Sequence, residues 1–233
     1  MKKLVALILA VYAALCLSAC GPLGENKPVF SGLEDMEVEK YSSPDYTRGV
    51  SVRDGAGKEL PFTYDASKVN PAVPGTYYVT YYAGNGLEKR TVVVKPDQSD
   101  VEALAAEIAA KLADDPEMIR NYVRSTIRYS HDWGGETPVW YGFQNHRGNC
   151  YVHALCLKSL LDIKGYHTLL IWTEDRTHYW LMIELEGGWK HIDATPGRLH
   201  SRYSLMNDTQ RLETLYSDGH PRRWDRTAWP ESP

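Results

Sequence analysis

The pattern of the chain changes near residue 96, and this change limits how it can fold. Before it, short alternating runs at residues 36–39, 76–82 and 90–94 are separated by turns rich in Gly and Pro, as is typical of β-strands. After it, residues 99–102 read as a capping box that begins a helix. We therefore expect an all-β domain at residues 33–96 and an α+β domain at residues 97–233.

The second domain alternates between helix and strand signals. Asp115 precedes a proline in the way that an N-cap precedes a helix. Another helix is expected to begin at Cys150, to run to about Lys164 and to stop at Gly165. Strands follow at residues 167–173, 178–185 and 189–193, while residues 130–148 are expected to form a loop and residues beyond 196 a polar tail.

Composition indicates a globular protein and excludes one class of partner. The chain is 43% hydrophobic and 24% charged, with a formal net charge of −4. A mildly acidic chain lacks the basic surface that binds nucleic acid. We expect a monomer that binds no nucleic acid.

The N-terminus carries an export pattern. Lys2 and Lys3 precede an apolar run at residues 4–17, which is short for a membrane span and typical of a signal peptide. The run ends in Leu-Ser-Ala-Cys at residues 17–20, which resembles the lipobox of bacterial lipoproteins. The resemblance implies a signal peptide at residues 1–19, a lipidated Cys20, a tether at residues 20–32, and attachment to the outer face of the cell membrane. A plain signal peptide is the alternative.

Two cysteines then remain in the folded part, Cys150 and Cys156. Six residues along one helix separate them by about 9 Å, which is too far for a disulfide. An unpaired thiol in an exported protein is consistent with a reactive cysteine.

The order Cys150, His178, Asp193 is suited to acyl transfer through a thiol. A cysteine in the first turn of a helix lies near unpaired N–H groups and the positive end of the helix dipole, which favour the thiolate. His178 would act as the base and Asp193 would orient its ring. His153 and His167 are the competing bases nearest in sequence.

The hairpin between residues 178 and 193 constrains this triad. A turn at Gly187-Gly188 would place Asp193 opposite Met182, roughly 13 Å from His178. A turn at residues 186–187 would place Asp193 opposite Trp180, and one at residues 185–186 would place it opposite His178. All three registers keep the two side chains on one face. The triad therefore requires that the turn is not at Gly187-Gly188, or that a β-bulge intervenes.

Three short patterns resemble the transglutaminase-like superfamily, whose core is related to papain-like cysteine proteases. They are Gly-x-Cys at 148–150, His-Tyr-Trp at 178–180 and Trp-x-x-x-Asp-x-Thr-Pro at 189–196. The resemblance implies a helix bearing the Cys packed on an antiparallel sheet, and a Cys150, His178, Asp193 triad. We expect no cofactor, and no metal site, because no close His, Cys or Asp ligand spacing appears on one element. Separately, residues 74–81 and 90–94 resemble bacterial immunoglobulin-like surface domains, which implies a β-sandwich that serves as a spacer or an adhesive module.

Further residues are candidates for substrate contact. The backbone N–H of Cys150 could stabilise an oxyanion, and Gln144 resembles the Gln that precedes the Cys in papain-like proteases. Aromatic side chains could line an acyl groove or belong to the core; those considered for the groove are Trp140, Tyr141, Trp172 and Trp180.

These observations favour a lipid-anchored thiol enzyme that acts on amide bonds of peptides or proteins, including cell-wall peptides. Hydrolysis is favoured over transfer to an amine, because water is abundant whereas an amine acceptor needs a site that excludes water. The alternative is a catalytically inactive module that binds the cell surface or cell wall.

Overall fold

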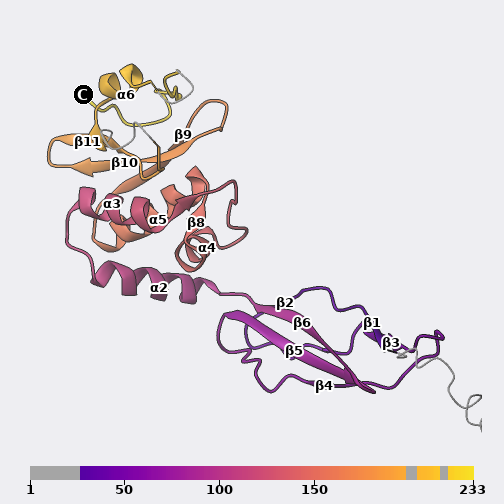
Figure 1. Ribbon diagram of the computed structural model, residues 1–233. Helices are drawn as coiled ribbons and strands as arrows, with labels where there is room; N and C mark the ends of the chain where they lie inside the picture. Colours follow the sequence, from indigo (N-terminus) through magenta and orange to yellow (C-terminus); the bar gives the residue numbers. More distant parts are fainter. Residues whose placement is uncertain (1–26, 198–203, 216–219) are drawn as a thin grey trace, which may run out of the picture. The chain divides into compact units, whose positions relative to one another are not determined.

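The computed structural model describes residues 27–197, 204–215 and 220–233 (Figure 1). The predicted signal peptide, Cys20 and the first part of the predicted tether lie outside these residues. The chain divides into two compact units, one ending at Lys95 and the other beginning at Pro96. No helix among the described residues is long and apolar enough to cross a membrane.

The N-terminal unit consists of two small sheets. The larger has the order β2-β6-β5-β4, with β2 parallel to β6, and the smaller pairs β1 with β3. The strands are β1 (Val29–Ser31), β2 (Met36–Val38), β3 (Ser51–Arg53), β4 (Thr63–Asp65), β5 (Gly75–Ala83) and β6 (Gly86–Val94). The sequence prediction of a tether up to residue 32 is wrong at its end, because Val29–Ser31 pairs with β3. The immunoglobulin-like assignment stays a prediction.

The β5–β6 hairpin is the centre of this unit. Ala83 pairs with Gly86, so Gly84 and Asn85 make a two-residue turn, and Gly84 adopts a positive φ of 54° that suits a glycine. The inward residues of the two strands alternate with exposed ones and form a buried cluster with Val38: Val79, Tyr81, Val92 and Val94. Period-two alternation of this kind predicts a strand with one buried face.

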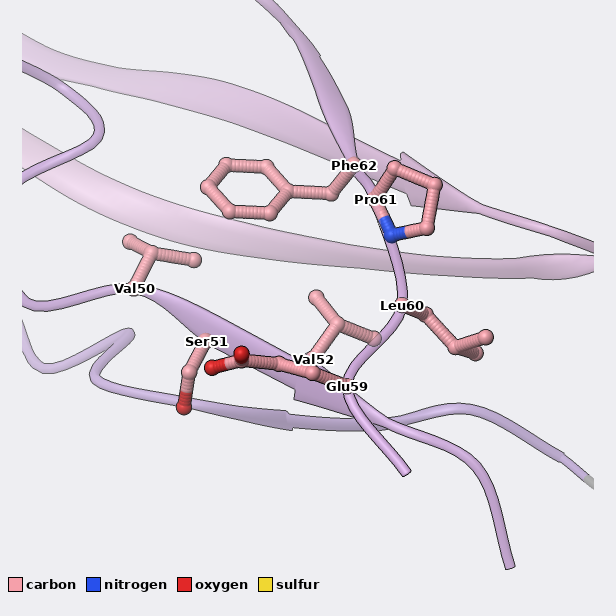
Figure 2. A pocket seen from close by; sticks show the side chains of 7 residues that line it. All are labelled: Val50, Ser51, Val52, Glu59, Leu60, Pro61 and Phe62. Atoms are coloured by element: carbon pink, nitrogen blue, oxygen red, sulfur yellow. The ribbon is translucent and has the colours of Figure 1, made fainter. Parts of the chain in front are cut away.

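A pocket of about 460 Å³ also belongs to the N-terminal unit (Figure 2). It lies between β3 and the segment that follows the turn after it, where Leu60 donates its backbone N–H to Val52. Its lining residues are Val50, Ser51, Val52, Glu59, Leu60, Pro61 and Phe62. None of the candidate catalytic residues belongs to this pocket.

The second unit begins with capped helices. Its helices are α2 (Gln98–Ala110), α3 (Pro116–Thr126), α4 (Pro138–Asn145), α5 (Cys150–Ile163) and α6 (Asp208–Glu213). Asp115 caps α3 by accepting from Met118 N–H, as predicted. The predicted capping box at residues 99–102 is wrong, because Asp97 is the N-cap of α2 and Asp100 completes the box.

Residues 130–148 are not a continuous loop, which corrects the sequence prediction. They contain α4, which begins at Pro138, and the two-residue strand β8 (Arg147–Gly148), which pairs with β7 (Arg128–Tyr129). Eight residues give too few turns for a clear apolar period, so the helix is hard to recognise from the sequence.

One antiparallel sheet separates two layers in this unit (Figure 1). Its order is β12-β11-β10-β9, from β9 (Thr168–Trp172), β10 (Tyr179–Leu185), β11 (Gly188–Ile192) and β12 (Ser204–Met206). Leu181, Ile183 and Ile192 face the helical layer and pack with α3 and α5. The prediction that the helix bearing the Cys packs on an antiparallel sheet is confirmed.

The opposite face of the sheet is covered by the end of the chain. Trp180 and Met182 pack there with Trp224, Leu212 and Trp229. The description of residues beyond 196 as a polar tail is therefore wrong for the described part, which supplies α6 and several core aromatics. The signal was weak because isolated aromatics in a polar segment have no periodicity.

Candidate active site

Cys150 is the first residue of α5, where the sequence predicted it. Asn149 is the N-cap and accepts from the Val152 N–H at 3.1 Å. The strand β8, which precedes the helix, fixes the path of the chain into α5. The carbonyl of Gly148 accepts from Ser130 N–H at 2.9 Å. Gly148 also packs so closely on Val152 that a Cβ at position 148 would clash with that side chain. The N–H of Cys150 has no acceptor within its own helix, because first-turn N–H groups never do.

The two cysteines of the described chain are free thiols in different environments. Cys150 is 6% exposed, and its Sγ lies 3.9 Å from the carbonyl oxygen of Thr177. Cys156 is fully buried beside the carbonyl of Val139, and burial raises the pKa of its thiol. A buried thiol that resists ionisation is a poor nucleophile.

The β10–β11 hairpin brings His178 to Asp193. Leu185 pairs with Gly188, so the turn is at residues 186–187 and not at the two glycines. Continuing this register sets Asp193 opposite Trp180, and His178 lies diagonally beside it on the same face. The Nε2 of His178 is 2.8 Å from Oδ2 of Asp193, so the geometric condition set by the sequence is met.

The loop before β10 holds the His178 backbone. Thr173 Oγ1 accepts the N–H groups of both Thr177 and His178, at 3.0 and 3.1 Å. The same loop presents the Thr177 carbonyl to the Cys150 thiol. The loop therefore sets the position of the imidazole and contacts the sulfur.

The charge of His178 depends on its neighbours. Burial lowers the pKa of its imidazole, but the charge of Asp193, the hydrogen bond to Asp193 and the Cys150 side chain together outweigh burial and raise this pKa above its usual value. Because Nε2 donates to Asp193, Nδ1 is the nitrogen available to the thiol. The arrangement can accept a proton from Cys150 and return it.

The competing histidines have other partners. His153 is fully buried, with Nδ1 2.8 Å from the Asn149 carbonyl and Nε2 2.8 Å from the Ile127 carbonyl. Both ring nitrogens are therefore engaged by backbone oxygens. His167 is largely exposed and pairs with Glu184 at 2.9 Å. Neither has a ring nitrogen left in a position suited to the base.

Asp193 is held by Thr195, which belongs to the pattern at residues 189–196, and by two arginines that the sequence did not single out. Its Oδ1 accepts from Thr195 N–H at 2.9 Å, and its backbone carbonyl accepts from Nε of Arg120 at 2.6 Å. Its Oδ2, which binds His178, also accepts from Nη2 of Arg211 at 3.1 Å. Nothing in the sequence around Arg120 or Arg211 indicated a contact with Asp193, because α3 and α6 reach Asp193 only in the tertiary structure.

Trp180 does not line a groove, which corrects the sequence prediction. It is 1% exposed and stacks on His178, with ring centroids 5.6 Å apart and planes 18° apart. Its Nε1–H donates to Nδ1 of His191 at 3.0 Å. The chain beyond residue 204 covers this face, so Trp180 supports the site from beneath.

A second polar network adjoins the first. Nε2 of His191 donates to Oδ1 of Asp208 at 2.9 Å, and Nη2 of Arg226 donates to Oδ2 of the same carboxylate at 3.0 Å. Burial lowers the pKa of His191 to about 4, although the bond to Asp208 opposes this effect. His191 is therefore neutral when folded at neutral pH.

Acidification should destabilise the folded chain through His191. The folded pKa of about 4 lies below the unfolded value of about 6.5. The stabilisation is therefore present above pH 6.5 and is lost as pH falls toward 4, by about 3 kcal/mol at most. Urea unfolding at a series of pH values should show this loss in the unmodified protein and a smaller loss in H191Q.

The control for this measurement is H167Q, which removes a largely exposed histidine of the same unit. Its free energy of unfolding should follow that of the unmodified protein across the same pH range. Parallel curves for H191Q and the unmodified protein would contradict the assignment to His191.

The other predicted contact residues lie on α4. Gln144 is exposed in the last turn of this helix, and its oxyanion role stays a prediction. Trp140 is half-buried, and Tyr141 accepts at its hydroxyl from Nε of Arg147 at 2.9 Å. Their role in a groove also stays a prediction.

Two tyrosines follow the candidate catalytic residues in the chain. Tyr151 follows Cys150 and Tyr179 follows His178, and their ring centroids lie 5.2 Å apart, edge to face. The ring centroid of Trp172 lies 6.4 Å from that of Tyr179 and 5.0 Å from that of Trp229. Trp172 is half-buried, and its role in a groove also stays a prediction.

No group of three or more His, Cys, Asp or Glu among the described residues could hold a metal ion.

One family model matches part of the second unit. The model of the transglutaminase-like superfamily matches residues 102–194, which include Cys150, His178 and Asp193. The chain thus contains a transglutaminase-like domain, and the match ends before α6. No curated protein sequence matches the chain.

A solved structure also resembles the chain. It is described as "a Putative Cysteine Protease from Cytophaga hutchinsonii", is 16% identical, and has a TM-score of 0.34. The likeness covers 42% of this chain and 37% of that one, so the chain matches little more than a third of that protein's length.

Proposed function

We propose that the second unit is a thiol enzyme that acts on amide bonds of peptides or proteins. One observation carries the proposal: a histidine bound to a buried aspartate at 2.8 Å lies next to a cysteine at the start of a helix. A nucleophile, a base and a group that orients the base are the elements of covalent acyl chemistry. The match to the transglutaminase-like superfamily supports the same chemistry.

The reaction proceeds in two halves. The Cys150 sulfur attacks the amide carbonyl carbon while its proton passes to Nδ1 of His178. The C–N bond then breaks, and His178 returns the proton to the departing amine, which leaves a thioester on Cys150. Water then attacks the thioester with His178 as base, which releases the acid and restores the thiol.

The start of α5 assists both halves of the reaction, the formation of the thioester and its hydrolysis. The N–H of Cys150 and the positive end of the α5 dipole lie where the carbonyl oxygen gains negative charge. The bond to Asp193 keeps the His178 ring in the tautomer that accepts the thiol proton. Hydrolysis is the simpler outcome, because water needs no acceptor site of its own.

Trapping the intermediate tests this function. A library of blocked peptides with amide side chains is incubated with the protein, and intact mass is measured after acid quenching. The expected result is a mass increase on Cys150 equal to the peptide less its leaving amine, reversed by hydroxylamine as a thioester is. Adding a primary amine and comparing acid with amide product separates hydrolysis from transfer.

Two controls make the trapping experiment decisive. C150S should give no thioester, while C156S retains the candidate nucleophile and should give the adduct. If neither peptides nor a small thiol-directed electrophile modifies Cys150 faster than Cys156, the chain is a binding module and the proposal fails.

We further propose that the enzyme acts outside the cell, held to the membrane by lipid on Cys20, with cell-wall peptides among its substrates. The motif at residues 17–20 supports this proposal, and the N-terminal unit would serve as a spacer. Metabolic labelling with a lipid precursor should mark the unmodified protein, and C20A should remain uncut or be released. An unlabelled unmodified protein would rule out the anchor.

A further inference from the structure

Arg211 is a buried cation that contacts the candidate site from outside the matched family region. Its side chain is fully buried, and its Nη2 donates to Oδ2 of Asp193 at 3.1 Å. Its guanidinium carbon also lies 4.4 Å from the centroid of the Trp180 ring. The family match ends at residue 194, so α6 lies outside the matched residues.

The chain delivers Arg211 through a short strand and a capped helix. β12 pairs with the end of β11, with a register shift between His191 and Ile192. Asn207 then caps α6 in a capping box with Gln210, and Arg211 donates its N–H to the Asn207 carbonyl at 2.9 Å. Arg211 is thereby fixed beneath the carboxylate by backbone contacts.

We propose that Arg211 is a positioning residue for the triad, which orients the Asp193 carboxylate and balances its charge so that His178 can both accept and release a proton. The role would extend the Cys150, His178, Asp193 set by a fourth residue supplied by α6.

Arg211 and His178 bind the same oxygen of Asp193, and this distinguishes the proposed role of Arg211 from that of an ordinary ion pair. Oδ2 of Asp193 is 2.8 Å from His178 and 3.1 Å from Arg211, so both partners act on one atom. Oδ1 is held separately by Thr195. The three bonds together fix the carboxylate plane, and a rotation that broke the Arg211 bond would also displace the atom that binds His178.

Charge balance is the second part of the role. Without Arg211, the buried negative charge of Asp193 would raise the pKa of His178 further and favour its protonated form. With Arg211, Asp193 is neutralised whether His178 carries a proton or not. In agreement, burial and then the charge and bonds of Asp193 and Cys150 are the main influences on the pKa of His178, and Arg211 acts in the lowering direction.

Other titratable or charged groups lie around Arg211 and Asp193, and a test must separate their effects from that of Arg211. They come from α3, α5, β11 and α6, and are Arg120, Cys150, His153, His191 and Asp208.

The test is an NMR titration of the His178 ring in the full chain, which needs no substrate and no turnover. The inference rests on the proposed function for its meaning, but this readout can fail independently of it. In R211M the His178 titration should move upward by about one pH unit, because the remaining carboxylate is no longer balanced. In R226M, which removes the arginine bound to Asp208 instead, the His178 titration should not move.

A double variant tests whether the effect passes through Asp193. In D193N, adding R211M should shift the His178 titration by less than a third of its effect in the unmodified background. A folded R211M with an unchanged His178 titration, or an equal shift in both backgrounds, would overturn the proposal.

If R211M does not fold, R211Q keeps a donor while losing the charge, and the same upward shift is expected. In the unmodified protein, the side-chain nitrogen resonances of Arg211 should change with pH at the same midpoint as His178. Resonances of Arg211 that do not respond to the His178 titration would overturn the proposal without any variant.

Discussion

Replacing Cys150 by Ala should abolish acyl-enzyme formation completely, while replacing Cys156 by Ala should leave it intact. The first change removes the only thiol of the described chain that lies at a helix start and beside His178. The second removes a fully buried thiol whose ionisation is suppressed by burial. The measurement is labelling by a thiol-directed electrophile at neutral pH, located by peptide mapping.

The two cysteine variants also separate an effect on the reaction from an effect on the free energy of unfolding. C156A empties a well-packed position where Sγ contacts the α4 backbone, and should lower the free energy of unfolding by about 1–2 kcal/mol. C150A should change this free energy less, because the site lies at the end of the helix. Labelling that persists in C150A and disappears in C156A would reverse the assignment.

Replacing Asp193 by Asn should slow acylation by on the order of 10⁴-fold, as the same change does in the triad of a serine protease. The amide presents a donor where Nε2–H of His178 needs an acceptor, so the ring loses the tautomer that accepts the thiol proton. H178A should abolish turnover. Rates of Cys150 alkylation and acylation are measured against pH for each variant.

His153 provides the matched control, since it is a buried histidine one turn along the same helix as Cys150. H153A removes a buried ring whose nitrogens lie 2.8 Å from the Asn149 and Ile127 carbonyls, and it should cost about 2–3 kcal/mol of stability. The folded fraction of H153A should keep the rates of Cys150 alkylation and acylation of the unmodified protein. If H153A removes the pH dependence of alkylation while H178A retains it, the base has been assigned to the wrong histidine.

Local patterns in the sequence were enough to predict the elements that carry the candidate triad. The sequence predicted that α5 begins at Cys150 and stops at Gly165, and the turn possibilities around residues 185–188 kept His178 and Asp193 on one face of the hairpin. These signals depend only on residues close together in the chain, where caps and alternation act.

Other features could not be recognised locally. α4 is too short for a clear period, and the role of Trp180 depends on whether its face of the sheet is covered. The sequence treated Trp180 as a candidate for the groove, but Leu212 of α6, Trp224 and Trp229 pack on that face and bury it.

Local patterns were sufficient to predict the two-part organisation, the helix that begins at Cys150 and the hairpin that carries His178 and Asp193. The register of the hairpin, the burial of Trp180 and the contact of Arg211 with Asp193 became known only from the folded chain. The difference lies in the range of the interactions. Caps and alternation act over a few residues, whereas Arg211 reaches Asp193 across 18 residues of chain through packing that no local pattern records.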